Sequence, residues 1–299
     1  MDELRFDGRV AVVTGAGQGL GWAYARLLAE RGAKVVINDL GCAVSGDGSD
    51  ASVAQLAVEK IVAAGGEVVA STATVATPEG GKAIIGKALD TWGRIDILVH
   101  NAGIVRRAPF REMDAGTFEA ILAVHLRGGF HVAQPAFVAM EKAGYGRIVM
   151  TSSIAGLYGL ATQVNYSTAK AGLIGLMRAI HEEAQGTGVQ ANAIVPGGAT
   201  RMAGTTELAA SPDLSPELVA PMVAWLAHES CTQSGEIMIG TAGRMARAVV
   251  VESPGVYRTN WTIEQVAADL AEIRDISAPM EFDFMGHLRH TFGMAGTKL

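Results

Sequence analysis

The sequence predicts an α/β fold in which helices cover both faces of a doubly wound parallel sheet. Two observations carry this prediction. Short apolar runs alternate with longer stretches of helical periodicity along most of the 299 residues. Most of the short runs are continuously apolar, as strands buried on both faces require. A sheet built this way binds ligands at the carboxyl ends of its strands.

The elements follow one another in a regular order. The predicted strands are residues 10–13, 35–37, 67–70, 95–99, 148–150, 190–195 and 237–239. Helical patterns between them include residues 20–31, 52–64, 81–92 and 117–143. Gly32 follows the first of these helices and can end it in the left-handed conformation.

The last part of the chain has a different pattern. We expect residues 1–243 to form the α/β domain and residues 244–299 to form a helical extension packed on that same domain. The pattern of residues 244–251 is mixed, and residues 262–275 predict an amphipathic helix with Thr262 and Gln265 at capping-box spacing. From Pro279 onward the pattern predicts an irregular tail.

Composition excludes several classes of protein. Hydrophobic residues make up 49% and charged residues 18%, which supports a large core and argues against disorder. The net charge of −6 lacks the basic excess of nucleic-acid-binding proteins. No stretch approaches the roughly 18 apolar residues that a membrane span needs. The start of the chain lacks the pattern of a secretory signal.

The cysteines and histidines indicate no metal site. Cys42 and Cys231 lie far apart in the sequence and suggest neither a disulfide framework nor a zinc cluster. The pair His287 and His290 stands alone in a polar tail. A reducing, cytoplasmic location is therefore expected. The final residues 297–299, Thr-Lys-Leu, differ at one position from the Ser-Lys-Leu peroxisomal address.

A glycine-rich segment directly follows the first predicted strand and opens the first helix. It reads Thr-Gly-Ala-Gly-Gln-Gly-Leu-Gly from Thr14, and its candidate cofactor contacts are Gly15, Gln18, Gly19, Leu20 and Gly21. Glycine permits a tight turn and a close approach of backbone to a pyrophosphate. The helix N-terminus presents free N–H groups and a positive dipole end to the anion.

Asp39 ends the next predicted strand, eighteen residues after Gly21. An acidic residue roughly 20 positions after such a loop binds the adenosine ribose. Its carboxylate accepts hydrogen bonds from both ribose hydroxyls and repels a 2′-phosphate. Since no arginine or lysine follows immediately, the sequence favours NAD over NADP.

Tyr166 and Lys170 are candidate catalytic residues because they lie four positions apart, on one face of a predicted helix. A free phenol has a pKa near ~10, and a neighbouring ammonium together with oxidised nicotinamide favours the phenolate. Tyr166 could then exchange the proton that accompanies hydride transfer. Ser153 follows a strand and could hold the substrate oxygen. The segment Asn101-Ala102-Gly103 ends another strand and leaves room for the cofactor.

In their order and spacing, these motifs resemble the short-chain dehydrogenase/reductase family over about residues 8–240. The resemblance implies a Rossmann-type sheet and a role for Lys170 in binding the nicotinamide ribose. It also implies that Pro196, Gly197 and Thr200 lie at the nicotinamide, and that Thr74 and Val75 lie at the adenine. Thr74 departs from the family pattern, because an aspartate usually stands there.

Two further departures concern histidines. His125 replaces an asparagine that holds a water in the family's proton relay, and could alternatively be an ordinary helix histidine. His100 replaces the first asparagine of the usual Asn-Asn-Ala-Gly. The (3R)-hydroxyacyl-CoA dehydrogenase branch also carries the histidine at 125, so we expect an altered relay there. Segments 38–41, 124–128, 145–148 and 226–230 resemble the same branch.

The expected reaction is reversible hydride transfer between NAD and a secondary alcohol. A (3R)-3-hydroxyacyl-CoA is the first choice of substrate, followed by a 17β-hydroxysteroid; a 3-oxoacyl-thioester reductase is a third reading. An NAD-binding sensor or scaffold without turnover is the non-enzyme alternative.

Residues 199–221 are expected to form a substrate lid, or else a plain surface loop. Small residues along the Tyr166 helix, with the family's habit, predict a homodimer or homotetramer.

Overall fold

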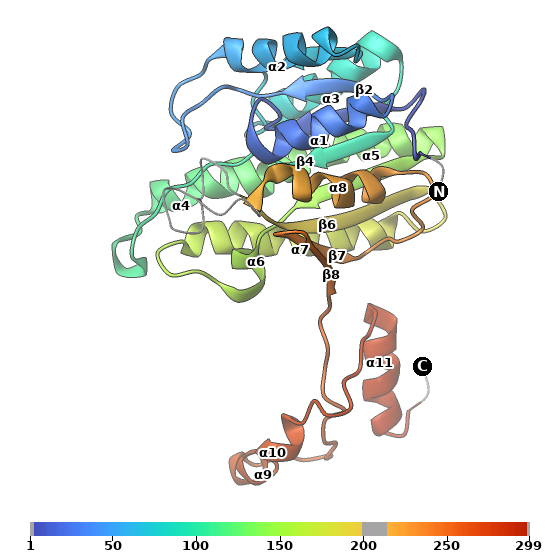
Figure 1. Cartoon of the computed structure of the whole chain (residues 1–299). Helices are drawn as coiled ribbons and strands as arrows, with labels where there is room; N and C mark the ends of the chain where they lie inside the picture. The colour runs from blue at the N-terminus through green and yellow to red at the C-terminus, as the bar shows by residue number, and fades with distance from the viewer. Residues whose placement is uncertain (1–2, 199–213, 298–299) are drawn as a thin grey trace. The chain divides into compact units, whose positions relative to one another are not determined.

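The computed structural model describes residues 3–198 and 214–297. Its eight-stranded sheet has the order β3-β2-β1-β4-β5-β6-β7-β8 (Figure 1). The strands are β1 Val10–Thr14, β2 Lys34–Asn38, β3 Val68–Ser71, β4 Ile97–His100, β5 Gly146–Thr151, β6 Val189–Gly197, β7 Ile237–Thr241 and β8 Arg244–Ala248. Neighbours from β3 to β7 pair in parallel, so the predicted doubly wound sheet is confirmed.

Helices cover both faces of this sheet. Helices α1 (Gly19–Glu30), α2 (Ala51–Ala63) and α8 (Ala220–Ala227) pack on one face, and α3 (Pro78–Trp92), α5 (Gly128–Ala143) and α7 (Val164–Glu183) pack on the other (Figure 1). Every residue of β1, β4 and β5 is buried. The continuously apolar runs of these strands follow from this burial, because a central strand faces helices on both sides.

The predicted helix at residues 117–143 contains a change of geometry. Helix α4 (Ala115–Leu122) passes into a π-helical turn at Ala123–Arg127 and continues as α5. Such turns are rare and occur frequently at functional sites. Here the turn carries the buried His125.

The mixed pattern at residues 244–251 conceals an edge strand. Ala242 and Gly243 both have positive φ angles and join β7 to β8 by a two-residue turn, the geometry that closes a hairpin. Every residue of β8 is exposed or half-buried, so the strand's sequence shows no regular alternation of apolar and polar residues.

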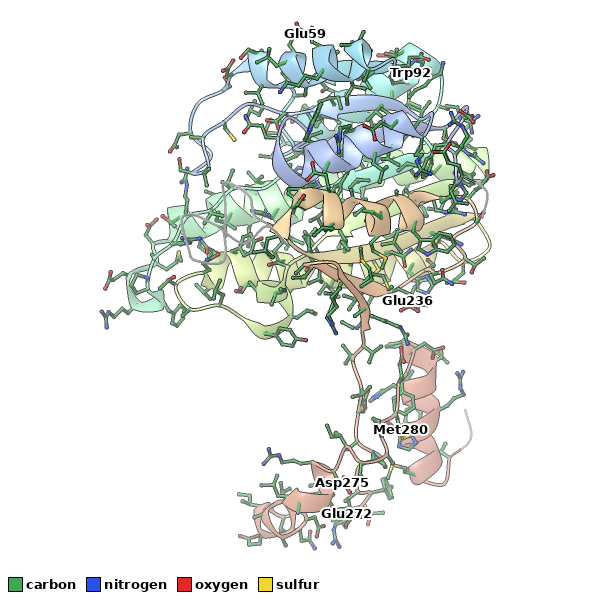
Figure 2. All side chains as sticks on the ribbon, in the orientation of Figure 1. Glu59, Trp92, Glu236, Glu272, Asp275 and Met280 are labelled. Carbon is green, nitrogen blue, oxygen red and sulfur yellow. The ribbon has the colours of Figure 1, made fainter. Side chains whose placement is uncertain are left out.

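The chain divides into compact units at Arg247/Ala248, close to the predicted boundary at residue 243. That the second unit packs on the first stays a prediction. Within the second unit, Glu252 and Met280 form an isolated antiparallel bridge. Met280 is labelled in Figure 2. None of the helices in the described part of the chain combines the length and apolarity that crossing a membrane requires.

Two expectations for this second unit were wrong. The single helix expected over residues 262–275 is two short helices, α9 (Ile263–Ala268) and α10 (Leu270–Ile273), although the Thr262–Gln265 capping box is confirmed. The tail expected to be irregular contains α11 (Phe284–Met294), which begins where Asp283 accepts a hydrogen bond from the Gly286 amide. A side-chain cap of this kind can start a helix whose apolar pattern is weak.

Candidate active site

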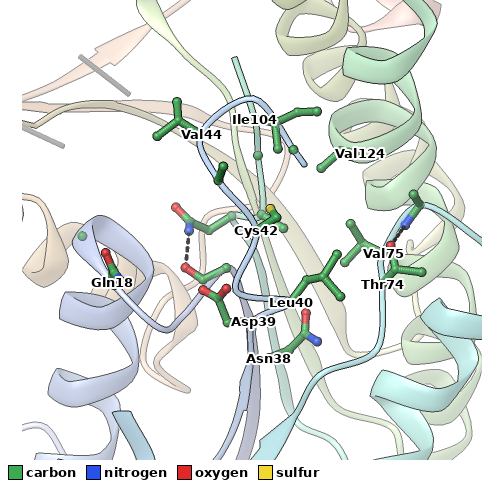
Figure 3. A pocket seen from close by; sticks show the side chains of 18 of the residues that line it. Gln18, Asn38, Asp39, Leu40, Cys42, Val44, Thr74, Val75, Ile104 and Val124 are labelled. Atoms are coloured by element: carbon green, nitrogen blue, oxygen red, sulfur yellow. Dashed lines mark hydrogen bonds between the residues drawn. The ribbon is translucent and has the colours of Figure 1, made fainter. Parts of the chain in front are cut away.

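A pocket of about 520 Å³ lies at the carboxyl ends of β1, β2 and β4 (Figure 3). Ten of the predicted cofactor residues line it: Gly15, Gln18, Gly19, Leu20, Asp39, Thr74, Val75, Asn101, Ala102 and Gly103. Its volume falls in the range of roughly 300–1,000 Å³ typical of small-molecule sites. The structure therefore brings these residues together around one cavity.

The glycine loop requires its glycines for close packing. A Cβ on Gly21 would lie 2.1 Å from the carbonyl oxygen of Gly15, and one on Gly15 would lie 2.8 Å from Ala102 Cα. Asn101 Nδ2 donates to the carbonyls of Thr14 (3.3 Å) and Gly15 (3.1 Å) and holds the loop against β4. Gly21 is thus needed for the packing of the loop, although it does not line the pocket.

The Asp39 carboxylate is fixed from both sides. Oδ2 accepts a hydrogen bond from the Gly17 amide at 2.8 Å, and Oδ1 accepts one from the Gly41 amide at 2.8 Å. Among the described residues that line the pocket there is no lysine or arginine. The charge facing this end of the pocket is therefore negative.

Sequence reasoning missed the β2–α2 loop, which we define as residues 40–50. Five of its residues line the pocket: Leu40, Cys42, Ala43, Val44 and Gly46 (Figure 3). The Val105 amide donates to the Val44 carbonyl at 2.8 Å, and Arg106 Nε donates to the Ser45 carbonyl at 2.8 Å. Arg106 also pairs with Asp47 at 3.2 Å. These partners are some sixty residues away in sequence, so no local pattern reveals the contact.

Helix α7 places Tyr166 and Lys170 on one face, as predicted. Lys170 Nζ lies 5.6 Å from the centroid of the Tyr166 ring and donates to the Thr151 carbonyl at 2.6 Å. Ser153 begins helix α6 (Ile154–Tyr158), and its hydroxyl accepts a hydrogen bond from the Ala155 amide at 3.1 Å. Tyr166 also forms a hydrogen bond with Ser153. The three predicted catalytic side chains are therefore neighbours.

Burial dominates the electrostatics of this group. It lowers the pKa of Lys170 to about 7. It also raises the pKa of Tyr166, which the hydrogen bond with Ser153 opposes. The sequence predicts a lowered pKa for Tyr166, but in the protein without cofactor the pKa is raised. Burial removes water from the phenolate, and the cost of this desolvation exceeds the stabilisation that the neighbouring side chain provides.

His125 belongs to the same group. Its ring is fully buried and meets the Tyr166 ring edge-on, with the centroids 5.2 Å apart. Nε2 lies within hydrogen-bond distance of the Ile104 amide (3.0 Å) and carbonyl (2.8 Å), and Nδ1 has no partner among the described residues. Burial and then Lys170 hold the pKa of His125 well below its usual value, so the ring is neutral.

Ile104 connects the pocket to the catalytic group. It lines the pocket and packs in a cluster with Ala169 and Ile121, against which Tyr166, Val124 and Cys42 also pack. A Cβ on Gly103, the preceding residue, would lie 2.4 Å from His125 Cε1. The pocket and the catalytic side chains thus form one site.

Two of the remaining predicted residues lie at the end of β6. Pro196 and Gly197 close this strand, and a Cβ on Gly198 would lie 3.2 Å from Leu20 in the glycine loop. Thr200 lies outside the described residues, as does most of the predicted lid at 199–221. The described end of that segment forms a 3₁₀ turn, Pro216–Leu218, and the start of α8.

Comparison with known proteins gives a consistent result. The family model for short chain dehydrogenases matches residues 9–210. The chain is 45% identical over 281 residues to the peroxisomal multifunctional enzyme type 2 of Drosophila melanogaster, covering 92% of this chain and 46% of that protein. It is 40% identical over 274 residues to a putative short-chain type dehydrogenase/reductase of Mycobacterium tuberculosis, covering 90% and 95%.

Solved structures agree with this comparison. The full-length Drosophila multifunctional enzyme superposes with a TM-score of 0.82 at 37% identity, covering 99% of this chain and 51% of that chain. The chain therefore spans about half the length of this relative. Sequence, fold and site agree that the chain belongs to the short-chain dehydrogenase family.

Proposed function

We propose that the protein transfers a hydride reversibly between NAD and the secondary alcohol of a (3R)-3-hydroxyacyl-CoA. One observation carries the hydride-transfer chemistry of this proposal. The Ser153, Tyr166 and Lys170 side chains are grouped beside a pocket that opens on a glycine loop and ends at a fixed carboxylate. The family implies a proton-coupled hydride transfer at such a site.

The pocket fits a dinucleotide. Glycines at 15 and 21 keep the turn tight, and the first amides of α1 are available to a pyrophosphate because Gln18 makes no side-chain cap among the described residues. When bound, the nicotinamide would supply or accept the hydride, and its positive charge would favour the Tyr166 phenolate. Asp39, Thr74 and Val75 would hold the adenosine half, and Lys170 the nicotinamide ribose.

The protein's own residues divide the remaining work. Ser153 would orient the substrate oxygen and stabilise its developing charge. Tyr166 would take the proton in alcohol oxidation and return it in ketone reduction. Lys170, with a pKa near 7, would shift the phenol toward phenolate when charged. His125, neutral and packed against Tyr166, would support the relay of that proton.

NAD rather than NADP follows from Asp39. Both of its oxygens are held by backbone amides, so the carboxylate cannot easily swing away from a 2′-phosphate. We expect kcat/KM for NAD to exceed that for NADP by roughly 100-fold or more, the effect of two like charges at close range. Asp39→Ser should narrow this ratio. Equal efficiency of the wild type with both cofactors would contradict the assignment.

The substrate class rests on the resemblance to the hydroxyacyl-CoA dehydrogenase branch. The test is NADH formation from (3R)- and (3S)-3-hydroxyacyl-CoAs and from 17β-hydroxysteroids, with Tyr166→Phe as the control. Turnover of the (3R)-thioester that falls by about 10²–10⁴-fold in the variant would support both chemistry and substrate. Turnover of steroids alone would keep the chemistry and replace the substrate. NAD binding without any turnover would favour the sensor reading.

We also propose a homodimer or homotetramer. Phe130 (53% exposed) and Val138 (55% exposed) project from α5, and the small residues Ala171 and Gly175 are exposed on α7. Light scattering at micromolar concentration should give a mass of at least two chains, and a monomer would refute it. A cytoplasmic location is proposed because the sequence contains only two cysteines, far apart in the chain, and so suggests no disulfide framework; imaging a fluorescent fusion can test it.

A further inference from the structure

His100 is a fully buried side chain for which the proposed reaction has no role. It stands at the carboxyl end of β4, between the glycine loop and the π turn. Its Nε2 lies 2.9 Å from the carbonyl oxygen of His125, and its Nδ1 lies 3.1 Å from Thr14 Oγ1. Both ring nitrogens therefore have a partner.

These partners determine the tautomer. A carbonyl only accepts, so Nε2 must carry the hydrogen. Burial lowers the pKa of His100 to about 3, so the ring is neutral and Nδ1 is an acceptor. Thr14 must then donate its hydroxyl hydrogen to Nδ1. This direction suits Thr14, because its oxygen already accepts from the amides of Asn101 (3.0 Å) and Ala102 (3.1 Å).

The two ends of this hydrogen-bonded chain belong to different halves of the site. Thr14, Asn101 and Ala102 adjoin the glycine loop, and Asn101 also holds the carbonyl of Gly15. The other end is the backbone of His125, whose ring packs on Tyr166. Space for the imidazole comes from Gly129, where a Cβ would lie 3.2 Å from His100 Cδ2.

We propose that His100 is a positioning residue that sets the distance between the cofactor loop and the His125–Tyr166 pair. Its Nδ1 atom holds Thr14 beside the glycine loop, and its Nε2 atom holds the backbone of His125, whose ring packs on Tyr166. The inference rests on the proposed function, since it assigns the two sides their roles. It predicts that one substitution can remove the contact of Nδ1 alone and that another can remove the contact of Nε2 alone.

Asparagine and glutamine at position 100 each keep one of these two contacts and lose the other. The Oδ1 atom of asparagine is one bond from Cγ, as Nδ1 is, so His100→Asn keeps an acceptor for Thr14 and loses the donor to His125. The Nε2 atom of glutamine matches the imidazole Nε2, so His100→Gln keeps the donor and loses the acceptor. A neutral hydrogen bond in such a network corresponds to about a three- to tenfold effect.

The experiment measures kcat, its pH profile and the NAD dissociation constant in both variants. His100→Asn should lower kcat about three- to tenfold and move the pH midpoint of kcat, with NAD affinity within about twofold of wild type. His100→Gln should weaken NAD binding about three- to tenfold, with kcat within about twofold. Thr14→Val should weaken NAD binding at least as much as His100→Gln, because it also removes the acceptor of the Asn101 and Ala102 amides, and His100→Gln should add nothing to it in the double variant.

Parallel changes in both parameters for both variants, or no change in either, would overturn the proposal. Two readouts need no substrate. Imidazole ¹⁵N NMR should show one histidine locked as the neutral Nε2–H form, and a charged or Nδ1–H ring at His100 would overturn the assignment. Amide exchange in the π turn should quicken in His100→Asn and not in His100→Gln. If every alcohol fails to react, the proposed function fails while NAD titration, NMR and exchange still decide this proposal.

Discussion

A buried lysine whose pKa is near 7 makes stability depend on pH. In the unfolded chain the Lys170 ammonium keeps its proton up to its ordinary pKa near 10.5, but in the fold it releases the proton near pH 7. The unfolded state therefore binds more protons in this window, and the free energy of unfolding rises with pH. The slope can reach about 1.4 kcal/mol per pH unit.

Denaturant unfolding between pH 7 and pH 9 checks this expectation. The wild type should gain stability as the pH rises, and Lys170→Met should lose that slope. An equal slope in the variant would mean that Lys170 keeps its ordinary pKa in the fold. A reversed slope in the wild type would contradict the burial argument outright.

Two glycines make a matched pair of substitutions. Gly21→Ala puts a Cβ 2.1 Å from the Gly15 carbonyl oxygen, so the loop must shift and NAD affinity should fall by at least about tenfold. Gly86→Ala, within α3, places its Cβ where no described atom lies within 4 Å. It should leave NAD binding unchanged and stabilise the protein by up to about 1 kcal/mol. Fluorescence titration with NADH and thermal melts measure both.

At the scale of elements, the β2–α2 loop is held in place by Arg106, a residue that follows β4 in the sequence. Arg106 donates to the Ser45 carbonyl and pairs with Asp47, so Arg106→Met should free the loop and weaken NAD binding about three- to tenfold. Arg111→Met is the control, because that side chain is 84% exposed and pairs with its neighbour Glu112. Equal effects of the two substitutions on NAD affinity would show that the loss of any positive charge weakens binding, and that the contacts of Arg106 with the β2–α2 loop do not matter.

Elements differ in how far sequence predicts them. The central strands were predictable because burial on both faces demands unbroken apolar runs, as at β4. Strand β8 was missed because it lies at the sheet edge with mostly exposed side chains. Helix α11 was missed because its apolar residues, such as Phe284 and Phe292, are themselves exposed and leave no clear stripe. The glycine loop and the Tyr166–Lys170 pair were predictable because their chemistry is local.

Across the whole molecule, the two ends of the parallel strands have different roles. The carboxyl ends form the site. At the amino ends, the buried Asp96 precedes β4 and accepts hydrogen bonds from the Val10 amide, Arg9 and Arg94. Asp96→Asn removes a charged acceptor, so the free energy of unfolding should fall by about 1.5–3 kcal/mol. NAD affinity should not change. A loss of NAD affinity without a loss of stability would contradict this separation.

Contacts across the molecule are the part that sequence conceals. In the sequence His100 is only a departure from the usual Asn-Asn-Ala-Gly motif, yet its importance rests on Thr14 and His125, which lie 86 and 25 residues away. Likewise, Asp39 was expected from its spacing, whereas the two amides that fix it depend on the folded turn. Spacing along the chain predicts which groups reach one edge, and only packing decides which of them touch.

The contact between Gly103 and His125 restricts the order in which this site can change over generations. A Cβ at position 103 would lie 2.4 Å from the imidazole, so a larger residue there is blocked while the histidine remains. A smaller residue at 125 would first have to open the space, and once position 103 had filled it, the histidine could not return. The two positions can therefore change in one order only, and a lineage that has passed both steps can revert only in the opposite order, with glycine restored at 103 before the histidine returns at 125.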